Sequence, residues 1–481
     1  MHSYVTATDQ FCGAGGSSQG AQAAGVEVRL AMNHWELAIK THNTNFPNTD
    51  HACTDISACD PRRYPSTDIL ITSPECTNHS VAKGKARTMQ AQLELFGSCA
   101  APNASAERSR ATMWDVVRFA EHHHYRIIIV ENVVEARWWT PFPAWIQAME
   151  LLGYTHKAVY LNSMFAHPTP QSRDRMYVIF WKKSLRAPDL SIYPVAHCSR
   201  CGQDVQSVQS WKNPAKPYGK YKQQYLYRCP TCADEVTPYY YCAANAIDWS
   251  LPAPRIGDRA RPLTDKTIKR IEVGLKKFGH QAQLVGNYSP GWTRPVSAPT
   301  GTVTAADHHS LLTPPYLVDL RGENAPRAIS DVLSTVCASG NHHSLVVPFL
   351  SSYYGTDSGS PITAAVPTVP THDRHSLVVA PFLMSYYTRV SGQQAAVSGL
   401  DTAMPTVPGR AVHYLSQPGE TPAVEDCGFR MLQPHEIKAA MGFRADYQIL
   451  GNQRDQVKQC GNAVTPPVME LLIRRCVAVL G

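Results

Sequence analysis

Short apolar runs alternate with amphipathic segments through the first 181 residues of the chain. Met113, Val116, Val117 and Ala120 follow helical spacing, which predicts a helix that covers a sheet. Alternating strands and helices are typical of an α/β fold with a doubly wound parallel sheet. The apolar runs predict buried strands over residues 28–32, 68–72, 126–130, 158–161 and 176–181.

Polar residues follow the strand ends at which open α/β sheets bind ligands. The run 68–72 leads into the sequence Ser-Pro-Glu-Cys76, which makes Cys76 a candidate nucleophile. A structural cysteine is the alternative, because free cysteines are among the most buried residues. Glu131 follows the run 126–130 at the same edge. Residues 77–111 form either a basic loop that closes over a substrate or a long insertion.

Two further segments carry candidate chemistry. The turn Phe-Cys-Gly-Ala-Gly-Gly at residues 11–16 joins a short strand to an expected helix over 18–24. Its glycines allow the backbone to approach a nucleotide-like ligand, and the absence of Lys-Ser/Thr disfavours ATP. Farther along, Arg173 and Arg175 alternate, which places both guanidinium groups on one face of an extended segment.

Five motifs in this order resemble those of the DNA (cytosine-5)-methyltransferase family, which uses S-adenosylmethionine. The resemblance covers residues 1–181 and 428–481 and implies a Rossmann-like catalytic domain completed by the C-terminal segment. The motifs are the turn Phe11 to Gly16, the Cys76 loop, Glu131-Asn132-Val133, the segment Gln171 to Arg175, and the segment Gln459 to Pro467.

The resemblance assigns catalytic roles that match the chemistry of cytosine. C5 is a poor nucleophile, so the Cys76 thiolate is expected to add at C6, while Glu131 hydrogen-bonds N3 and the exocyclic amine. Arg175 is expected to hold O2, and Arg173 to brace the Cys76 loop or a phosphate. A base then removes the C5 proton and the thiolate leaves. The cytosine must leave the duplex, and the 77–111 loop is expected to close over the DNA. The expected DNA contacts of this loop are Ser80, Lys83 and Lys85.

The resemblance also implies a site for S-adenosylmethionine, with the methionine end on the glycine turn and the adenosine against residues 33–36. Glu75 stands where the family usually has proline, and His34 stands where it commonly has a ribose-binding acid, for which Glu36 is a substitute. Both departures leave a modified S-adenosylmethionine open as the donor. The expected cofactor contacts are Phe11, Gly13, Gly15, Gly16, Trp35, Asp55, Ile56, Asn462 and Val464, the last two on a C-terminal helix expected to pack beside the glycine turn.

Residues 182–427 lie where the family keeps its target-recognition region, and they open with a candidate metal site. Two Cys-x-x-Cys pairs predict a zinc ribbon over residues 197–245 with a structural Zn²⁺. Four unpaired core thiols are the alternative, and Cys242 and His197 are spare ligands. The predicted ligands are Cys198, Cys201, Cys229 and Cys232.

Basic and aromatic residues interleave within this ribbon, a pattern suited to phosphate contact and base stacking. The alternative is that its tyrosines only pack on one another. The expected DNA contacts here are Lys212, Lys220, Lys222 and Arg228.

The rest of the insertion is expected to contain a basic amphipathic helix over 264–278 and a β repeat over 298–415. The repeat has four copies, each with Thr-Val followed by His-Ser-Leu or His-Tyr-Leu. Repeats of this kind usually stack to share a core. The turn tips His308, Asn341 and Arg374 are then expected to form a row that follows a DNA groove.

Charge and composition favour a protein that binds a polyanion and has no membrane span. The net charge of +7 resides in residues 197–280, which suits a protein that binds a polyanion; a solvated basic face is the alternative. Without an apolar run of about 18 residues or a signal-peptide pattern, we expect no membrane span. We expect a monomer in the cytoplasm, bacterial or that of a phage's host, with reduced cysteines. The expected partner is double-stranded DNA; RNA cytosine methylation and a catalytically silent DNA-binding relative are the alternatives.

Overall fold

The computed structural model describes residues 4–74, 104–251, 253–278 and 424–481, together with short segments between 283 and 415. Among the residues described, no helix has the length and apolar composition needed to span a membrane. The chain forms two compact units. The first consists of Met1–Ala246, Pro299–Asp307 and Gln433–Gly481, and the second of Ile247–Ala298 and His308–Leu432.

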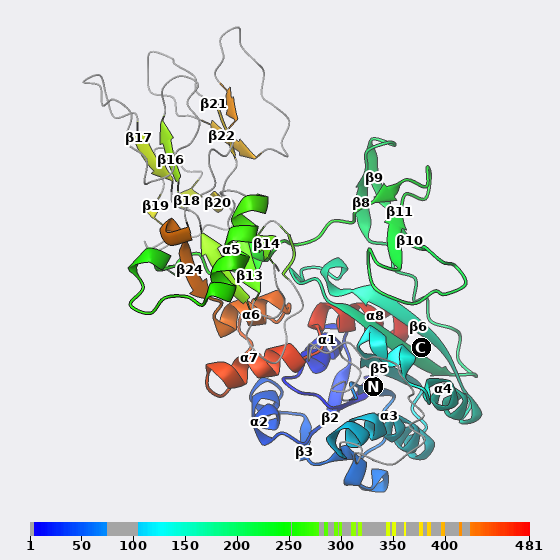
Figure 1. Cartoon of the computed structure of the whole chain (residues 1–481). Helices are drawn as coiled ribbons and strands as arrows, with labels where there is room; N and C mark the ends of the chain where they lie inside the picture. Colours follow the sequence, from blue (N-terminus) through cyan, green and yellow to red (C-terminus); the bar gives the residue numbers. More distant parts are fainter. Residues whose placement is uncertain are drawn as a thin grey trace, which may run out of the picture. The chain divides into compact units, whose positions relative to one another are not determined.

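A seven-stranded sheet, in the order β3-β2-β1-β4-β5-β7-β6, forms the centre of the first unit. Figure 1 labels β2, β3, β5 and β6 of this sheet. The buried apolar runs predicted from the sequence are all present as strands of this sheet. Ile69, Leu70, Ile71 and the run 127–130 are almost fully buried, as central strands require. The strands are β1 Thr6–Gln10, β2 Glu27–Asn33, β3 Asp50–Cys53, β4 Ile69–Thr72, β5 Ile127–Asn132, β6 Tyr154–Asn162 and β7 Asp174–Lys182.

The sheet is mixed, whereas the sequence predicted a doubly wound parallel sheet. β7 runs antiparallel to both of its neighbours, β5 and β6, whereas the pairs among β1 to β5 are parallel. The physical reason is the connection from β6 to β7, residues 163–173. It contains one 3-10 turn, Ser163–Phe165, and no helix, and it is too short for a parallel crossover.

Helices cover both faces of this sheet. Asp9 of β1 bonds to α1, while Asn132 of β5 lies against Met113 of α3. The strand register places Asp9 and Asn132 on opposite faces, because side chains alternate along each strand. The architecture is therefore a doubly wound α/β fold. Its helices are α1 Gly16–Ala23, α2 Glu36–Asn45, α3 Ala104–His123, α4 Phe142–Leu151, α6 Pro434–Ala440, α7 Gln453–Asn462 and α8 Pro466–Val477.

The C-terminal segment completes the first unit. α8 packs on α1 so closely that a Cβ at Gly20 would lie 2.6 Å from the carbonyl oxygen of Pro466. Arg474 donates to the carbonyl of Ala23, and Arg126 to that of Leu480. Residues from the two ends of the chain thus share one core, which includes Val26, Val28, Val468 and Leu472.

The predicted ribbon belongs to this first unit. A hairpin of β8 Val195–Cys198 and β9 Gln203–Gln206 precedes a small sheet of β10 Val208–Trp211, β11 Tyr225–Arg228 and β12 Glu235–Val236. Gln209 of β10 donates to the carbonyl of Tyr160 on β6, so the small sheet is bonded to the edge of the large one.

The second unit has a helix and short antiparallel strands. The predicted basic helix is confirmed as α5 Asp265–Phe278, whose Ile271 and Leu275 lie in a small core with Phe429. β14 Thr293–Pro295, β13 Gln283–Gly286, β15 His309–Thr313 and β24 Gly428–Met431 form one sheet in that order. The sequence assigned residues 428–432 to the C-terminal segment that completes the catalytic domain, but these residues lie in the second unit.

The internal repeat forms strands that pair from one copy to the next. β16 Tyr316–Asp319 pairs with β17 His343–Val346, and β18 Phe349–Ser352 with β20 His375–Val378. β21 Phe382–Ser385 pairs with β22 Ala396–Gly399 and with β23 His413–Leu415, and β18 pairs with β19 Ser360–Pro361. The histidine of each copy thus begins a strand. The turn tips His308, Asn341 and Arg374 lie outside the described residues.

Candidate active site

An ion pair at the carboxyl end of β5 forms the centre of the candidate site. Glu131 Oε1 lies 2.9 Å from Arg175 Nε, and the two side chains are only 11% and 13% exposed. β5 carries the carboxylate and β7 the guanidinium, with Glu131 opposite Tyr177 in the register. A carboxylate and a guanidinium that remain partly accessible in this way present fixed hydrogen-bonding groups to a ligand.

Arg173 is oriented toward the C-terminal segment. Its guanidinium donates to the carbonyl oxygens of Gly461, at 3.1 and 3.2 Å, and of Ala463, at 3.3 Å. The side chain is buried, and Asn162 Oδ1 accepts from the Arg173 backbone N–H. Arg173 therefore links the start of β7 to the last of the five sequence motifs.

The strand that leads to Cys76 ends beside Glu131. The buried Asn132 side chain donates to the Pro74 carbonyl at 3.2 Å, and the Ser73 N–H donates to the Gln10 carbonyl at 3.3 Å. The candidate nucleophile is two residues farther along the chain than this anchored carbonyl. α3 begins at Ala104, so the last residues of the segment proposed as a loop over 77–111 are helical. Glu75, Cys76, Ser80, Lys83 and Lys85 lie outside the described residues.

The glycine turn has the backbone conformation that its sequence predicts. Gly13 and Gly15 have φ values of 53° and 86°, and Phe11 shares the left-handed region at 56°. A Cβ at Gly16 would lie 2.0 Å from the Val464 carbonyl oxygen, so only glycine fits at this position. Val464 therefore packs beside the turn as expected. It lies between α7 and α8, whereas the sequence placed it on a helix.

A buried hydrogen-bonded chain supports the turn, and the sequence did not reveal it. Ser17 and Ser18 donate to Asp9 Oδ2 at 2.5 and 2.6 Å, and His42 Nε2 lies 2.8 Å from Ser18 Oγ. His42 Nδ1 lies 2.8 Å from His51 Nε2. Burial raises the pKa of Asp9 to about 6 and lowers that of His42 to about 3, so His42 is neutral near pH 7. Since Ser18 donates to Asp9, His42 Nε2–H donates to Ser18.

Trp35, Asp55 and Ile56 of the expected cofactor contacts lie just after the carboxyl ends of β2 and β3. Trp35 is half-buried, and Lys458 Nζ of α7 lies 4.3 Å from its ring centroid. Asp55 caps a 3-10 turn by accepting from Ser57 N–H, and Ile56 is buried below it. Asn462 is the exposed last residue of α7.

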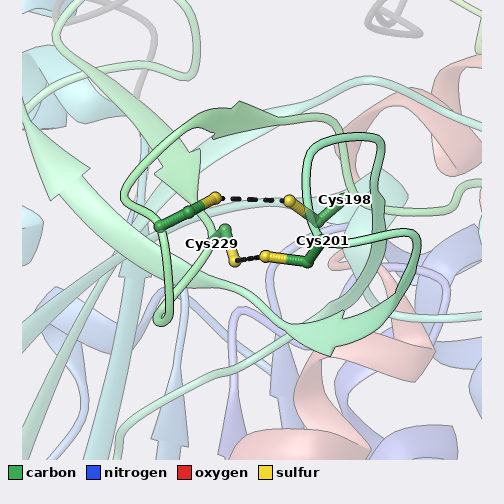
Figure 2. A group of neighbouring side chains, drawn as sticks. Cys198, Cys201 and Cys229 are labelled. Carbon is green, nitrogen blue, oxygen red and sulfur yellow. Dashed lines mark hydrogen bonds between the residues drawn. The ribbon is translucent and has the colours of Figure 1, made fainter.

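Four cysteine thiols converge in the ribbon, and Figure 2 shows three of them labelled. Their Sγ atoms all lie within 4.8 Å of one another, with Cys198 to Cys232 at 3.5 Å and Cys201 to Cys229 at 3.8 Å. The spare candidates lie elsewhere: His197 Nδ1 is 3.2 Å from Asp204, and the Cys242 thiol accepts from Asn245. The cluster thus consists of the two Cys-x-x-Cys pairs.

Comparison with known proteins gives the family. Residues 5–228 and 377–478 match the family described as C-5 cytosine-specific DNA methylase. The chain belongs to this family. Type II methyltransferase M.HgiDI of Herpetosiphon aurantiacus is 25% identical over 305 residues, 59% of this chain and 89% of that protein. M.HgiBI of the same organism is 28% identical over 177 residues, and the aligned part is only 36% of each chain.

Solved structures of other proteins are similar to this chain at low sequence identity. Spodoptera frugiperda DNMT2 has a TM-score of 0.47 and 12% identity, with 98% of this chain and 99% of that one covered. Entamoeba histolytica methyltransferase EhMeth has a TM-score of 0.44 and 11% identity, with all of both chains covered.

The basic ribbon residues of this DNA methylase family member make contacts within the protein. Lys220 Nζ lies 2.5 Å from Glu135 Oε1, and Lys212 Nζ donates to the Lys222 carbonyl at 2.7 Å. Arg228 donates to the Ala233 carbonyl. Tyr225 and Tyr227 are buried against Tyr221 and one another, so the expectation that they stack on bases was wrong. The alternative, in which the tyrosines pack together, is the arrangement observed.

Proposed function

We propose that the protein transfers the methyl group of S-adenosylmethionine to C5 of a cytosine in a specific duplex DNA sequence. The observation that carries this proposal is the Glu131–Arg175 ion pair beside the strand that leads to Cys76, in a member of the C5 methylase family. This set of groups suits addition to a cytosine ring and not simple binding, because it combines a thiol, an acid and an oxygen-binding guanidinium.

In the proposed mechanism, the Cys76 thiolate forms a bond to C6 and electron density moves toward C5 and N3 of the flipped cytosine. In its protonated form Glu131 donates to N3 and accepts from the exocyclic amine, while Arg175 orients Glu131 and holds O2. The bound donor supplies an electrophilic methyl group for C5. A base then removes the C5 proton, and the C6–sulfur bond breaks to restore the thiolate and the aromatic ring.

The residues around the glycine turn fit the proposed cofactor. Among the residues that the structure describes, Asp9 Oδ1 and both amide atoms of Gln10, just before this turn, are buried and have no hydrogen-bond partner. Buried polar groups of this kind are usually satisfied by a ligand or by water. Trp35 and Asp55 would hold the adenosine, while the turn from Phe11 to Gly16 would hold the methionine end.

DNA is favoured over RNA as the substrate by the relatives, which carry the name Type II methyltransferase. We expect tritium from labelled S-adenosylmethionine to appear in duplex DNA and not in tRNA. Label only in tRNA would favour the alternative substrate, and label in neither would favour a silent DNA-binding relative. Bisulfite-type sequencing of DNA from cells that express the protein would then identify the target. We assign recognition of that target to the insertion within residues 182–427.

We further propose that the four ribbon cysteines bind one structural Zn²⁺. A tetrahedral ion with Zn–S bonds of about 2.3 Å places its sulfurs about 3.8 Å apart, which is close to the separations of 3.5 Å for Cys198 to Cys232 and 3.8 Å for Cys201 to Cys229. With four thiolates the shell is closed, so the ion would stabilise the ribbon and take no part in methyl transfer.

The purified protein should contain about one zinc ion per chain by elemental analysis. Cys229→Ser should lose most of this metal and melt at a lower temperature, because a ligand is missing from a closed shell. Cys242→Ala should keep both the zinc and the wild-type melting temperature, since the Cys242 thiol lies outside the cluster. A wild-type protein free of zinc would contradict the proposal.

A further inference from the structure

The turn between β10 and β11 has a shape defined by its own sequence. Gly219 and Lys222 have φ values of 145° and 64°. Gln224 Oε1 accepts from the Lys220 N–H at 2.9 Å, and a Cβ at Gly219 would lie 2.4 Å from the Gln224 side chain. We name residues 218–222 the docking turn. Its conformation directs Lys220 and Tyr221 toward the catalytic body.

One side of the docking turn binds the segment that follows β5. Lys220 Nζ lies 2.5 Å from Glu135 Oε1, and the two side chains are 29% and 23% exposed. Glu135 belongs to the 3-10 turn Val134–Trp138, which comes directly after the strand that carries Glu131. In addition, the Tyr218 ring lies 5.2 Å from Trp138. An ion pair that is largely withdrawn from solvent is more constraining than an exposed one.

The other side of the docking turn binds the start of β7. The Tyr221 backbone N–H donates to Asp174 Oδ1 at 3.0 Å. Asp174 stands between Arg173 and Arg175, and alternation along a strand directs its side chain to the face opposite theirs. Burial raises the pKa of Asp174, although the bond from Tyr221 opposes this. The Tyr221 ring also packs edge-on against Phe165, with centroids 4.9 Å apart.

Both strand ends that carry the central ion pair therefore bond to the same five-residue turn. We infer that the docking turn is a positioning element, in which Lys220 and Tyr221 fix the ends of β5 and β7 so that Glu131 and Arg175 face each other. This inference rests on the proposed catalytic roles of those two residues. Lys220 then acts on the chemical step, and not as the phosphate contact that its charge suggested.

Lys220→Met should lower kcat by about tenfold or more, because a small displacement of catalytic groups has a large effect on rate. The KM for S-adenosylmethionine and the Kd for duplex DNA should stay near wild-type values. Lys216→Met is the matched control, since it removes the same charge from an exposed position in the same segment. Glu135→Gln should reproduce the kcat loss, and the double variant should be no worse than the poorer single variant.

Two further measurements separate positioning from misfolding and from failure of the proposed function. The exchanged pair Lys220→Glu with Glu135→Lys should regain part of the kcat that Lys220→Glu loses. Amide hydrogen exchange over residues 131–138 and 173–177 should be faster in Lys220→Met but not in Lys216→Met, and this readout needs no activity. If the wild type transfers no methyl group, the proposed function fails and the exchange data alone test the docking turn. Unchanged kcat and exchange in Lys220→Met, with weaker DNA binding, would overturn the inference.

Discussion

Cys76→Ala should transfer no measurable methyl group, with kcat lower by about 10⁴-fold or more, because the ring of cytosine is not activated without addition at C6. S-adenosylmethionine binding should be retained, since the groups expected to hold the cofactor lie at the glycine turn and at the ends of β2 and β3. Tritium transfer to duplex DNA measures the loss of methyl transfer. Calorimetric titration with S-adenosylmethionine measures the cofactor binding that is retained.

Covalent trapping tests the same residue directly. On duplex DNA that contains 5-fluorocytosine, the wild type should form an adduct that survives denaturation, because fluorine at C5 blocks the final elimination. Cys76→Ala should form none. Cys242→Ala should form the adduct as the wild type does, since its thiol contacts Asn245 in the ribbon. An adduct that persists in Cys76→Ala would assign the nucleophile to another cysteine.

The sequence predicted the strands of the catalytic sheet because burial on both faces leaves a plain apolar signal. The run 126–130 became β5 Ile127–Asn132, and the run 176–181 became β7 Asp174–Lys182. The direction of β7 was not predictable from these runs. It follows from the short connection 163–173, whose length matters only once β6 and β7 are known to be neighbours.

Site residues that belong to a sequence motif were predictable. Site residues whose role depends on a tertiary contact were not. Glu131 and Arg175 came from separate motifs, and the register of β5 against β7 brings them to 2.9 Å. Asn132 also came from a motif, but its bond to the Pro74 carbonyl gave no local signal, because the two residues are distant in the sequence. His42 gave no signal for the same reason, since its partner Ser18 lies on another helix. Likewise, the charge of Lys220 indicated DNA, whereas its partner Glu135 lies 85 residues away.

Glu131→Gln should lower kcat by about 10²- to 10⁴-fold while the KM for S-adenosylmethionine changes little. The glutamine amide keeps the size of the side chain and can still donate to N3 and accept from the exocyclic amine, but it supplies no acidic proton. It also replaces a charged partner of Arg175 at 2.9 Å by a neutral one, which weakens the orientation of both groups.

Single-turnover methylation of duplex DNA gives the effect on chemistry, and the rate of trapping by 5-fluorocytosine gives the effect on addition at C6. Both rates should fall together in Glu131→Gln, because the acid assists the addition and not the later elimination. Glu150→Gln is a suitable control, since Glu150 lies on α4 and pairs with His156 away from the ion pair. If trapping in Glu131→Gln stayed at the wild-type rate while methylation fell, Glu131 would act after the covalent bond forms, and its assignment to the addition step would be wrong.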